Sequence, residues 1–344
     1  MLKIAVVILN YNGKHWLEKF LPNVIENTTY PNAEIIVADN ASTDDSIAFL
    51  KVNFPIVKII QNTENTGYAG GYNEALKHVK ADIYCLLNSD VEVTKNWLES
   101  ILPTFENAKV MAAQPKILSY HNKSAFEYAG AAGGFIDKYG YPFCRGRIFE
   151  TLENDTHQYN EPTEIFWASG ACLFVRSFIF HKLGGFDEDF FAHQEEIDLC
   201  WRIKNLGYTI MYAPKSVVYH VGGGTLNKSN PKKTFLNFRN NRFLLIKNLS
   251  QKEYQKISFI RNSLDIIAAI VALLKGNLQE AKAIINALKA LKKQQSLYLK
   301  KRTNNELLIQ LSAIDKPNGN GIYSKSILYQ YFLKGKKKYS EIFD

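Results

Sequence analysis

Short apolar runs in the first 90 residues each end in a polar cluster. The runs cover residues 4–9, 34–38, 57–60 and 83–87, and stretches with hydrophobic residues at helical spacing lie between them. Apolar runs bounded by polar residues predict buried strands, and strands that alternate with helices predict βαβ units. We therefore expect an α/β fold with a doubly wound, mostly parallel sheet.

The cluster after the fourth run places Asn88, Asp90 and Glu92 within five residues. In an open α/β sheet, ligands bind beyond the carboxyl ends of the strands, so a carboxylate there faces a site. Mg²⁺ and Mn²⁺ prefer oxygen ligands, and Mg²⁺ typically combines one or two carboxylates with substrate phosphates. The cluster predicts a divalent-cation site at Asp90. A strand followed by a solvated turn is the alternative for this cluster taken alone.

A glycine-rich stretch, residues 65–73, follows the third run and leads into a helical pattern. Glycine lets the backbone approach a ligand closely, and a helix N-terminus favours phosphate. The stretch matches neither the dinucleotide-binding pattern nor the Walker A pattern, so neither site is predicted. We interpret it as a loop that lies along a phosphate group, with an ordinary turn as the alternative.

Residues 103–165 show no pattern to which roles can be assigned, but clear patterns return after them. A buried strand is predicted over 167–176, and a strand over 217–220 ends in His220 at the mouth of the same sheet. On the predicted helix after residue 194, Asp198 and Arg202 share a face and suit an ion pair. Adjacent glutamates Glu195 and Glu196 follow an aromatic run and suit a general base in a partly desolvated pocket.

The cysteines predict a reduced, cytosolic protein. They are widely spaced, lie mostly in apolar runs and form no CxxC pair. The N-terminus has no signal-peptide pattern, so secretion is not expected. The longest apolar run of the C-terminal part, residues 266–274, is shorter than the ~20 residues that span a bilayer, so no transmembrane helix is expected. The cysteines are Cys85, Cys144, Cys172 and Cys200.

Charge divides the chain into two parts. Residues 1–225 hold 19 Lys and Arg against 26 Asp and Glu, whereas residues 226–344 hold 23 against 7. We expect the second part to be a basic helical extension in which the apolar stretch 265–275 is buried or enters an interface. Lysines near an anionic leaflet add roughly 1 kcal/mol each, which favours peripheral contact with an anionic membrane. A solvated face is the alternative, and no nucleic-acid partner is expected because no recognisable motif is present.

Taken together, the motifs resemble the inverting family 2 glycosyltransferases of the GT-A fold, especially the bacterial rhamnosyltransferase-like branch that builds surface polysaccharides. They occur in that family's order over residues 4–225. They are Asn-Tyr-Asn-Gly at 10–13, Asp-Asn-Ala-Ser-Thr-Asp at 39–44, the glycine-rich stretch at 65–73, Leu-Asn-Ser-Asp at 87–90, the stretch 184–202 and His-Val-Gly-Gly-Gly at 220–224.

The resemblance implies roles for individual residues. Asp90 takes the place of the last acid of the family's DxD motif, with Asn88 at the first position, and His220 completes a site for Mg²⁺ or Mn²⁺. Glu196 stands where the family carries its catalytic aspartate, and Glu195 is the alternative base. The donor-binding candidates are Asn10, Tyr11, Asp39, Asn65, Gly67, Gly71, Asn73, Asn88 and Ser89. Candidates for acceptor binding or structural support are Trp167, Asp187, Asp198 and Arg202.

The resemblance also implies a metal-dependent inverting glycosyltransferase with a GT-A domain over 1–225 and the basic extension over 226–344. It would move rhamnose or another hexose from a dTDP- or UDP-sugar to a glycan or a polyprenyl-diphosphate-linked glycan. Its expected place is cytoplasmic and peripheral, at the inner face of the cell membrane. A glycosidase is disfavoured. It needs an acid as well as a base, and it has no use for the phosphate-binding loops expected in the N-terminal half. A nucleotidyltransferase and an inactive glycan- or membrane-binding module are the alternatives.

Overall fold

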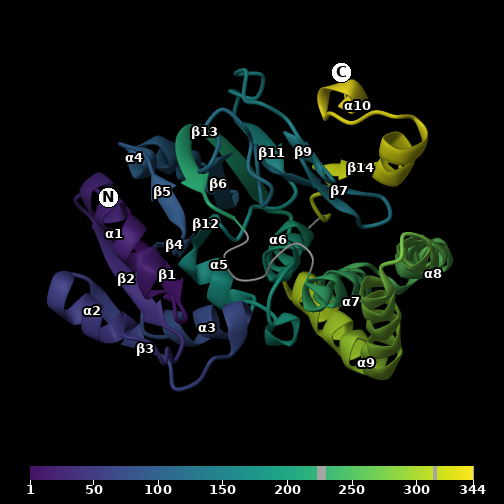
Figure 1. Ribbon diagram of the computed structural model, residues 1–344, viewed down its shortest axis with the longest axis horizontal. Helices are drawn as coiled ribbons and strands as arrows, with labels where there is room; N and C mark the ends of the chain where they lie inside the picture. The colour runs from purple at the N-terminus through teal and green to yellow at the C-terminus, as the bar shows by residue number, and fades with distance from the viewer. Residues whose placement is uncertain (223–229, 313–315, 344) are drawn as a thin grey trace.

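A large mixed sheet forms the centre of the molecule (Figure 1). The computed structural model describes residues 1–222, 230–312 and 316–343. In these residues the sheet has the order β11-β13-β6-β12-β4-β1-β2-β3, with β5 beside β13. Strands β1 to β4 pair in parallel, and β12 runs antiparallel between β4 and β6. The strands are β1 (Ile4–Asn10), β2 (Ala33–Asp39), β3 (Lys58–Gln61), β4 (Ile83–Asn88), β5 (Val91–Val93), β6 (Val110–Ser119), β11 (Thr163–Ile165), β12 (Cys172–Arg176) and β13 (Thr209–His220).

Helices cover both faces of this sheet, as the α/β prediction requires. Ile4, Val6 and Ile8 of β1 pack with one set of helices, and Ala5 and Val7 pack with the other. Successive side chains of a strand point to opposite faces, so a strand covered on both sides reads as a continuous apolar run. The first set is α1 (Lys14–Asn27), α2 (Ser46–Asn53) and α4 (Trp97–Ile101), and the second is α3 (Gly67–Leu76), α5 (Ser177–Lys182) and α6 (Glu195–Asn205). All four cysteines are free and buried, as predicted.

A smaller sheet accounts for much of the stretch that the sequence left unassigned. Its strand order is β10-β9-β8-β7-β14. The last of these strands comes from the C-terminal part of the chain and pairs in parallel with β7. The strands are β7 (Gly134–Asp137), β8 (Pro142–Cys144), β9 (Arg147–Ile148), β10 (Thr151–Leu152) and β14 (Ile322–Tyr323). Two short helical turns lie elsewhere, η1 (Leu102–Glu106) after α4 and η2 (Glu188–Phe190) before α6.

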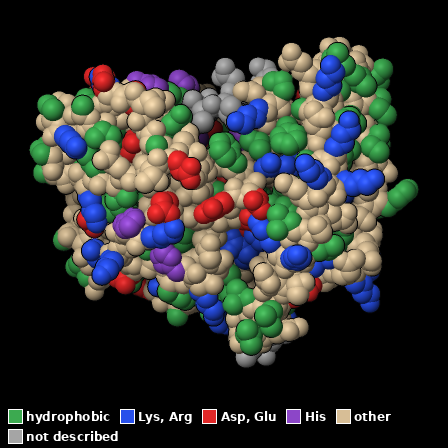
Figure 2. Space-filling model, turned by 90° about the horizontal axis from the view of Figure 1, so that it is seen from below, with side chains coloured by type: hydrophobic (Ala, Val, Ile, Leu, Met, Phe, Trp, Pro, Cys, Tyr) green, Lys and Arg blue, Asp and Glu red, His purple; other side chains and the backbone are tan. Residues whose placement is uncertain are grey.

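The predicted helical extension is confirmed, and it lies at the opposite end of the molecule from α1 and α2 (Figure 1). The side chain of Ser250 begins α8 by accepting a hydrogen bond from the amide of Glu253, and the Glu253 carboxylate accepts one from the amide of Ser250, which completes a capping box. Figure 2 shows Lys, Arg and hydrophobic side chains gathered at this end of the molecule. The domain boundary at residue 225 stays a prediction. The elements are α7 (Pro231–Asn248), α8 (Gln251–Leu274), α9 (Leu278–Leu311), η3 (Tyr329–Leu333) and α10 (Ser340–Phe343).

One helix of the described residues, α8, is long and apolar enough to cross a membrane by length and composition. The expectation of no transmembrane helix stays a prediction. It rested on the uninterrupted run 266–274, and polar residues such as Ser263 and Asp265 divide a longer apolar helix. Core helices of soluble proteins pass the same test, so length and composition alone do not place α8 in a bilayer.

Candidate active site

The polar ends of β1, β2 and β4 lie at one edge of the main sheet. Asn10 is opposite Asp39 in the parallel pairing of β1 with β2, and Leu9 is opposite Asn88 in the pairing of β1 with β4. The Nδ2 of Asn10 donates to Asp39 Oδ1 over 2.9 Å. The second carboxylate oxygen of Asp39 accepts from the amide of Ser42 at 2.9 Å. Beside this pair, the ring of Tyr11 is 49% exposed, so it presents an open aromatic face at the sheet edge.

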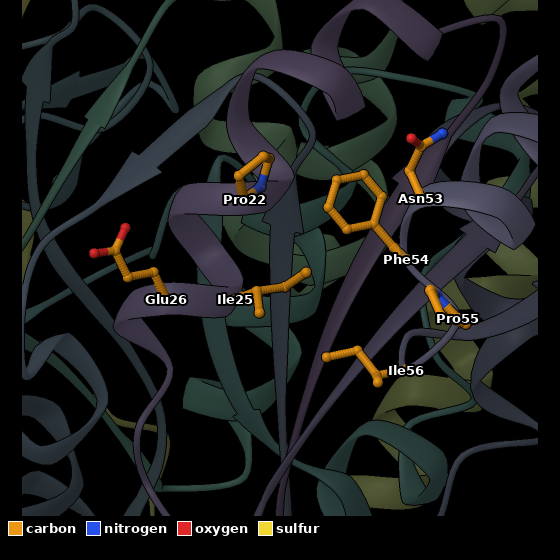
Figure 3. A pocket seen from close by; sticks show the side chains of 7 residues that line it. All are labelled: Pro22, Ile25, Glu26, Asn53, Phe54, Pro55 and Ile56. Carbon is orange, nitrogen blue, oxygen red and sulfur yellow. The ribbon is translucent and has the colours of Figure 1, made fainter.

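An apolar groove of about 420 Å³ lies elsewhere, between α1 and the segment that follows α2. Figure 3 shows Ile25 of α1 facing Phe54 and Ile56 across it. These residues belong to the carboxyl ends of helices that run back against parallel strands, so the groove is at the opposite edge of the sheet from Asp39. None of the predicted site residues lines it.

A network of side-chain amides fixes the glycine-rich stretch beside these strand ends. Asn40 donates to Asn65 Oδ1 at 2.9 Å and to the carbonyl of Gly67 at 3.0 Å. Asn62 in turn donates to Asn40 Oδ1 and to the carbonyl of Gly71, both at 3.0 Å. A Cβ on Gly71 would come within 2.9 Å of Asn40 Nδ2, so a side chain there would push Asn40 out of these hydrogen bonds. The network therefore explains why Asn65 and Gly71 lie at this edge.

The start of α3 also holds the loop that precedes α6. The amide of Tyr68 donates to the carbonyl of Phe191 over 2.9 Å. Gly67 has a positive φ of 75°, and a Cβ there would lie 2.6 Å from the same carbonyl. Asn73 makes two bonds to the backbone of Phe186, at 2.8 and 2.9 Å. In this structure Gly67 and Asn73 thus position a loop, and their predicted contacts with a diphosphate stay predictions.

Asp90, His220 and Glu127 form a buried charged cluster at the ends of β4 and β13. His220 Nε2 lies 3.2 Å from Asp90 Oδ1, and its Nδ1 lies 3.2 Å from Glu127 Oε2. The side-chain amide of Asn88 lies 3.3 Å from His220 Nε2. All three charged side chains are at most 9% exposed. Ser89, between Asn88 and Asp90, is half-buried.

The two carboxylates determine the protonation of His220. Burial would lower the pKa of the imidazole, but the charges of Glu127 and Asp90 and their hydrogen bonds raise it to about 10. Burial would likewise raise the pKa of Asp90, and the imidazolium overcomes this so that the pKa is lowered. The cluster therefore holds a positive charge between two carboxylates, at the place where the resemblance expects a cation.

This cluster fits the donor set for Mg²⁺ or Mn²⁺ in part. Asp90 offers an oxygen, and His220 offers a nitrogen once the ion displaces its proton, because only the neutral imidazole is a ligand. Such ions commonly take further ligands from substrate phosphates and water. Within residues 1–222, 230–312 and 316–343, no group of three or more His, Cys, Asp or Glu side chains is arranged to hold an ion by itself. The residues thus suit a site that the diphosphate of a substrate completes.

Glu127 is a functional candidate that the sequence analysis missed. It lies in the stretch without a recognisable pattern, 93 positions before His220. Its carboxylate also accepts a hydrogen bond of 2.6 Å from the amide of Ala129, which fixes its orientation. A carboxylate that accepts from one nitrogen of an imidazole orients the other nitrogen toward a metal. No local signal distinguishes Glu127 from a surface glutamate.

Glu195 and Glu196 open α6 directly after a strained segment. Phe191, His193 and Gln194 have positive φ angles of 63°, 71° and 71°. Non-glycine residues in this region are uncommon, and they persist where the surrounding structure enforces them. In the described part of the chain, one oxygen of each glutamate is buried without a hydrogen-bond partner. These carboxylates are therefore available to a group that the protein itself does not supply.

Burial separates the two glutamates in pKa. Burial raises the pKa of Glu196, and hydrogen bonds from backbone amides at the start of α6 oppose part of this rise, so the pKa is about 7. Burial and the charge of Glu196 raise the pKa of Glu195 well above its usual range, and this side chain is only 4% exposed. A general base works best with a pKa near the operating pH, which favours Glu196 over Glu195.

Tyr68 connects these glutamates to the strand ends. Burial raises the pKa of its phenol, and the nearby charges of Glu195 and Glu196 raise it further. Its hydroxyl donates to the carbonyl of Gly170 over 2.7 Å. The next carbonyl, of Ala171, accepts from the amide of Asn88 at 3.0 Å. Tyr68 and the backbone of residues 170–171 thus link the start of α6 to the end of β4.

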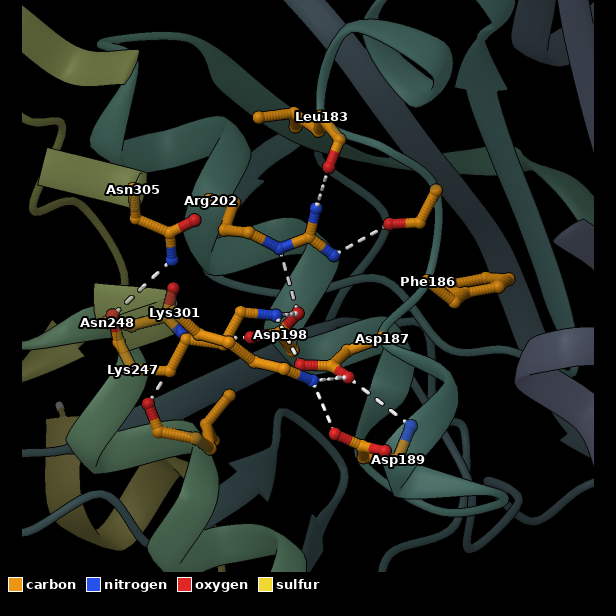
Figure 4. Close-up of polar contacts among 12 residues, drawn as sticks. Leu183, Phe186, Asp187, Asp189, Asp198, Arg202, Lys247, Asn248, Lys301 and Asn305 are labelled. Carbon is orange, nitrogen blue, oxygen red and sulfur yellow. Dashed lines mark hydrogen bonds and ion pairs between the residues drawn. The ribbon is translucent and has the colours of Figure 1, made fainter. Parts of the chain in front are cut away.

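A buried ionic network supports the segment that leads to the glutamates (Figure 4). Lys247 of α7 lies 2.8 Å from both Asp187 and Asp198. Lys301 of α9 also pairs with Asp187. The predicted Asp198–Arg202 pair is present at 2.8 Å, and Arg202 further donates to the carbonyls of Leu183 and Gly185, each at 2.8 Å. In the described part of the chain, the contacts of Asp187, Asp198 and Arg202 therefore hold the fold together around the start of α6.

Trp167 is likewise packed into the interior. Its indole nitrogen donates to the carbonyl of Phe135 over 2.9 Å, and the side chain is 3% exposed. A Cβ on Gly134 would lie 2.1 Å from the indole ring, so a glycine is needed beneath it. Trp167 thus joins the main sheet to the smaller sheet.

The chain matches a known family over its N-terminal part. The model of glycosyl transferase family 2 matches residues 5–184. Among curated proteins, the N-acetylglucosaminyl-diphospho-decaprenol L-rhamnosyltransferase of Mycobacterium tuberculosis is 25% identical over 233 residues, which are 63% of this chain and 75% of that protein.

Solved structures of glycosyltransferases share the fold. The mannosyltransferase PcManGT of Pyrobaculum calidifontis, solved with GDP-Man and Mn²⁺, has a TM-score of 0.53 at 15% identity, over 90% of this chain and 86% of that one. GalNAc-T7, solved with UDP, GalNAc and Mn²⁺, has a TM-score of 0.56 at 18% identity, over 72% of this chain and 48% of that one. The predicted fold class is therefore confirmed.

Proposed function

Because the chain belongs to glycosyl transferase family 2, we propose that it transfers rhamnose or another hexose from a dTDP- or UDP-sugar to a hydroxyl group of a glycan. The observation that carries this proposal is Glu196. Its carboxylate has a pKa of about 7 and a buried oxygen without a partner among the described residues, in the first turn of α6. That combination suits a base that removes a proton from an acceptor hydroxyl.

In the proposed reaction, Glu196 takes the proton of the acceptor hydroxyl as its oxygen attacks the anomeric carbon. The bond from that carbon to the diphosphate breaks, and a nucleoside diphosphate leaves with the electron pair. A single displacement inverts the configuration at the anomeric carbon. Tyr11, which is exposed, and Asp39 are the proposed contacts of the nucleobase, and the other donor-binding candidates are proposed to contact the rest of the donor.

Asp90 and His220 would hold the Mg²⁺ or Mn²⁺, which when bound neutralises charge on the departing diphosphate. Two structural relatives were solved with Mn²⁺, which supports a divalent ion without choosing between the two metals. Asn88 lies beside both residues and offers a neutral amide in place of a second carboxylate. Glu127 would keep the imidazole of His220 oriented toward the ion.

The proposed acceptor is a polyprenyl-diphosphate-linked glycan at the inner face of the cell membrane, in surface polysaccharide synthesis. The name of the mycobacterial relative includes a decaprenol-linked sugar, which supports a lipid-linked acceptor here. The excess of Lys and Arg in residues 226–344 supports peripheral contact with anionic lipids, and the proposed location is therefore cytoplasmic and membrane-peripheral.

Calorimetric titration with UDP-, dTDP- and GDP-sugars, each with and without Mn²⁺, tests the donor. We expect metal-dependent binding of one nucleotide class, followed by release of the nucleoside diphosphate when an acceptor is added. Release of inorganic diphosphate would identify a nucleotidyltransferase instead. Donor binding without turnover across a panel of lipid-linked acceptors would identify an inactive binding module, and no binding of any donor would reject the proposal.

A further inference from the structure

Helix α8 has two chemically different faces. Its inner face packs against the rest of the molecule through residues at helical spacing, namely Tyr254, Arg261, Asp265, Ala269 and Ala272. The outer face is apolar and exposed over about 24 Å of helix. Its members are Phe259 at 79%, Ile266 at 47%, Ile267 at 53%, Ile270 at 48%, Val271 at 41%, Leu273 at 50% and Leu274 at 83% exposure. Such a contiguous apolar stripe on a soluble surface marks a binding surface.

Buried polar contacts hold the inner face of α8 in place. Arg261 donates to Asn241 Oδ1 of α7 over 2.7 Å and lies 3.4 Å from Asp265. Arg242 of α7 lies 3.8 Å from Asp265 as well. The charged side chains of this group are at most 2% exposed. A helix that left the body to cross a bilayer would lose these partners and place Arg261 and Asp265 in hydrocarbon, which is costly. The helix is therefore built to lie on a surface rather than to span it.

Lysines surround the apolar outer face. Lys252 and Lys256 continue the same side of α8 toward its N-terminus, and Lys275 and Lys282 follow its C-terminal end, all four exposed. Figure 2 shows Lys and Arg side chains beside hydrophobic ones at this end of the molecule, where Asp and Glu are scarce. An apolar stripe with basic residues around it is the pattern of a helix that lies in the headgroup region of an anionic bilayer.

A second apolar tip lies at the same end of the molecule. Phe332 and Leu333 of η3 are 62% and 75% exposed, and exposed Lys334 follows them. The C-terminal segment that carries η3, between β14 and α10, is at the same end of the long axis as α8 (Figure 1). Two elements that are remote in sequence thus carry exposed apolar and basic side chains at the same end of the molecule.

We propose that the outer face of α8, together with the tip of η3, is the surface on which the protein docks to an anionic lipid bilayer. The relevance of this docking surface to a lipid-linked acceptor rests on the proposed function. A second copy of the chain fits the face less well, because a symmetric contact would bring the same lysines opposite one another. An anionic leaflet instead attracts them and accepts the apolar stripe between them.

Co-sedimentation with vesicles of phosphatidylglycerol and phosphatidylcholine, without donor or acceptor, tests this surface. The test variant is Ile267→Glu with Ile270→Glu. The control variant is Val52→Glu with Ile56→Glu, which changes the net charge equally at an apolar patch whose side chains are 79% and 80% exposed. We expect the test variant to bind at least about tenfold more weakly than wild type, and the control to bind like wild type. Equal binding by all three proteins would overturn the proposal.

Lysine variants, measured at low and high salt, separate the electrostatic contribution to vesicle binding from the apolar contribution. Lys252→Gln with Lys256→Gln should weaken binding by about fivefold per lysine at low salt and much less at high salt. Wild-type protein that resists release by high salt and alkaline carbonate would indicate a spanning helix and overturn peripheral docking. A wild-type dimer in light scattering that the test variant abolishes, without vesicle binding by either, would assign the face to self-association instead.

The same experiments distinguish this surface from the proposed function. The Glu196→Gln variant should sediment with vesicles like wild type, because the base has no part in docking. Vesicle binding without any sugar transfer would leave the docking surface intact and reject the enzyme activity. Transfer to a soluble glycan by a protein that binds no vesicle would support the enzyme activity and reject the docking surface. Circular dichroism and thermal melting of each variant confirm that the fold is retained.

Discussion

The ammonium group of Lys247 lies 2.8 Å from the carboxylate of Asp198, and this contact ties the helical extension to the helix that begins with the glutamates. The carboxylate is fully buried. Arg202 and Lys247 overcome the effect of burial and lower the pKa of Asp198 to about 2. The extension therefore supports the geometry of the site, whatever else it binds.

Replacing Lys247 with Met should destabilise the protein by about 3–5 kcal/mol, because two buried carboxylates then lose a partner. Urea unfolding measures the change. Lys300→Met is the control, since Lys300 is exposed on α9 and should alter stability by less than about 0.5 kcal/mol. Equal effects of the two substitutions would show that the buried pairing contributes nothing.

Replacing Glu196 with Gln should leave donor affinity unchanged and reduce the transfer rate by at least about 10²-fold, because the acceptor hydroxyl keeps its proton. Single-turnover measurements with saturating donor isolate this step. Glu195→Gln is the matched comparison at the neighbouring position. If that variant loses transfer while Glu196→Gln retains it, the base is Glu195.

The transfer rate should rise as pH increases through about 7, where Glu196 loses its proton.

The same raised pKa means that the folded state holds this proton more tightly than the unfolded state. Ionisation of Glu196 therefore lowers the free energy of unfolding as pH rises from the unfolded pKa to about 7. Glu196→Gln should remove that loss, which is on the order of 3 kcal/mol above neutral pH. A rate profile flat between pH 5.5 and about 8.5 would contradict this assignment.

Replacing Glu127 with Gln should weaken Mn²⁺ binding by about 10–100-fold in the presence of a nucleoside diphosphate, because His220 loses the carboxylate that orients it. Electron paramagnetic resonance titration of free Mn²⁺ reports the affinity without any need for turnover. Asp90→Ala should lose the metal-dependent part of nucleotide binding. Glu150→Gln, at an exposed position, is the control and should bind Mn²⁺ like wild type.

Much of the fold could be predicted because it follows from local pattern. The runs at 4–9 and 83–87 lie in the sheet as the central strands β1 and β4, and the tail forms helices as expected. The smaller sheet could not be predicted, since strands as short as Arg147–Ile148 carry no periodicity and β14 joins from a remote part of the chain. The length of α8 was missed because its inner, polar face divides the apolar sequence.

The sequence by itself determined which residues stand at strand ends and helix starts, among them Asn10, Asp39, Asp90 and Glu196. Alternation of apolar and polar positions is a local property, so it can be read without knowing the neighbours of a segment. Only the tertiary structure decided that Glu127 faces His220 and that Lys247 faces Asp198. Contacts across such separations depend on how the elements pack, and packing combines many weak interactions that no short stretch of sequence contains.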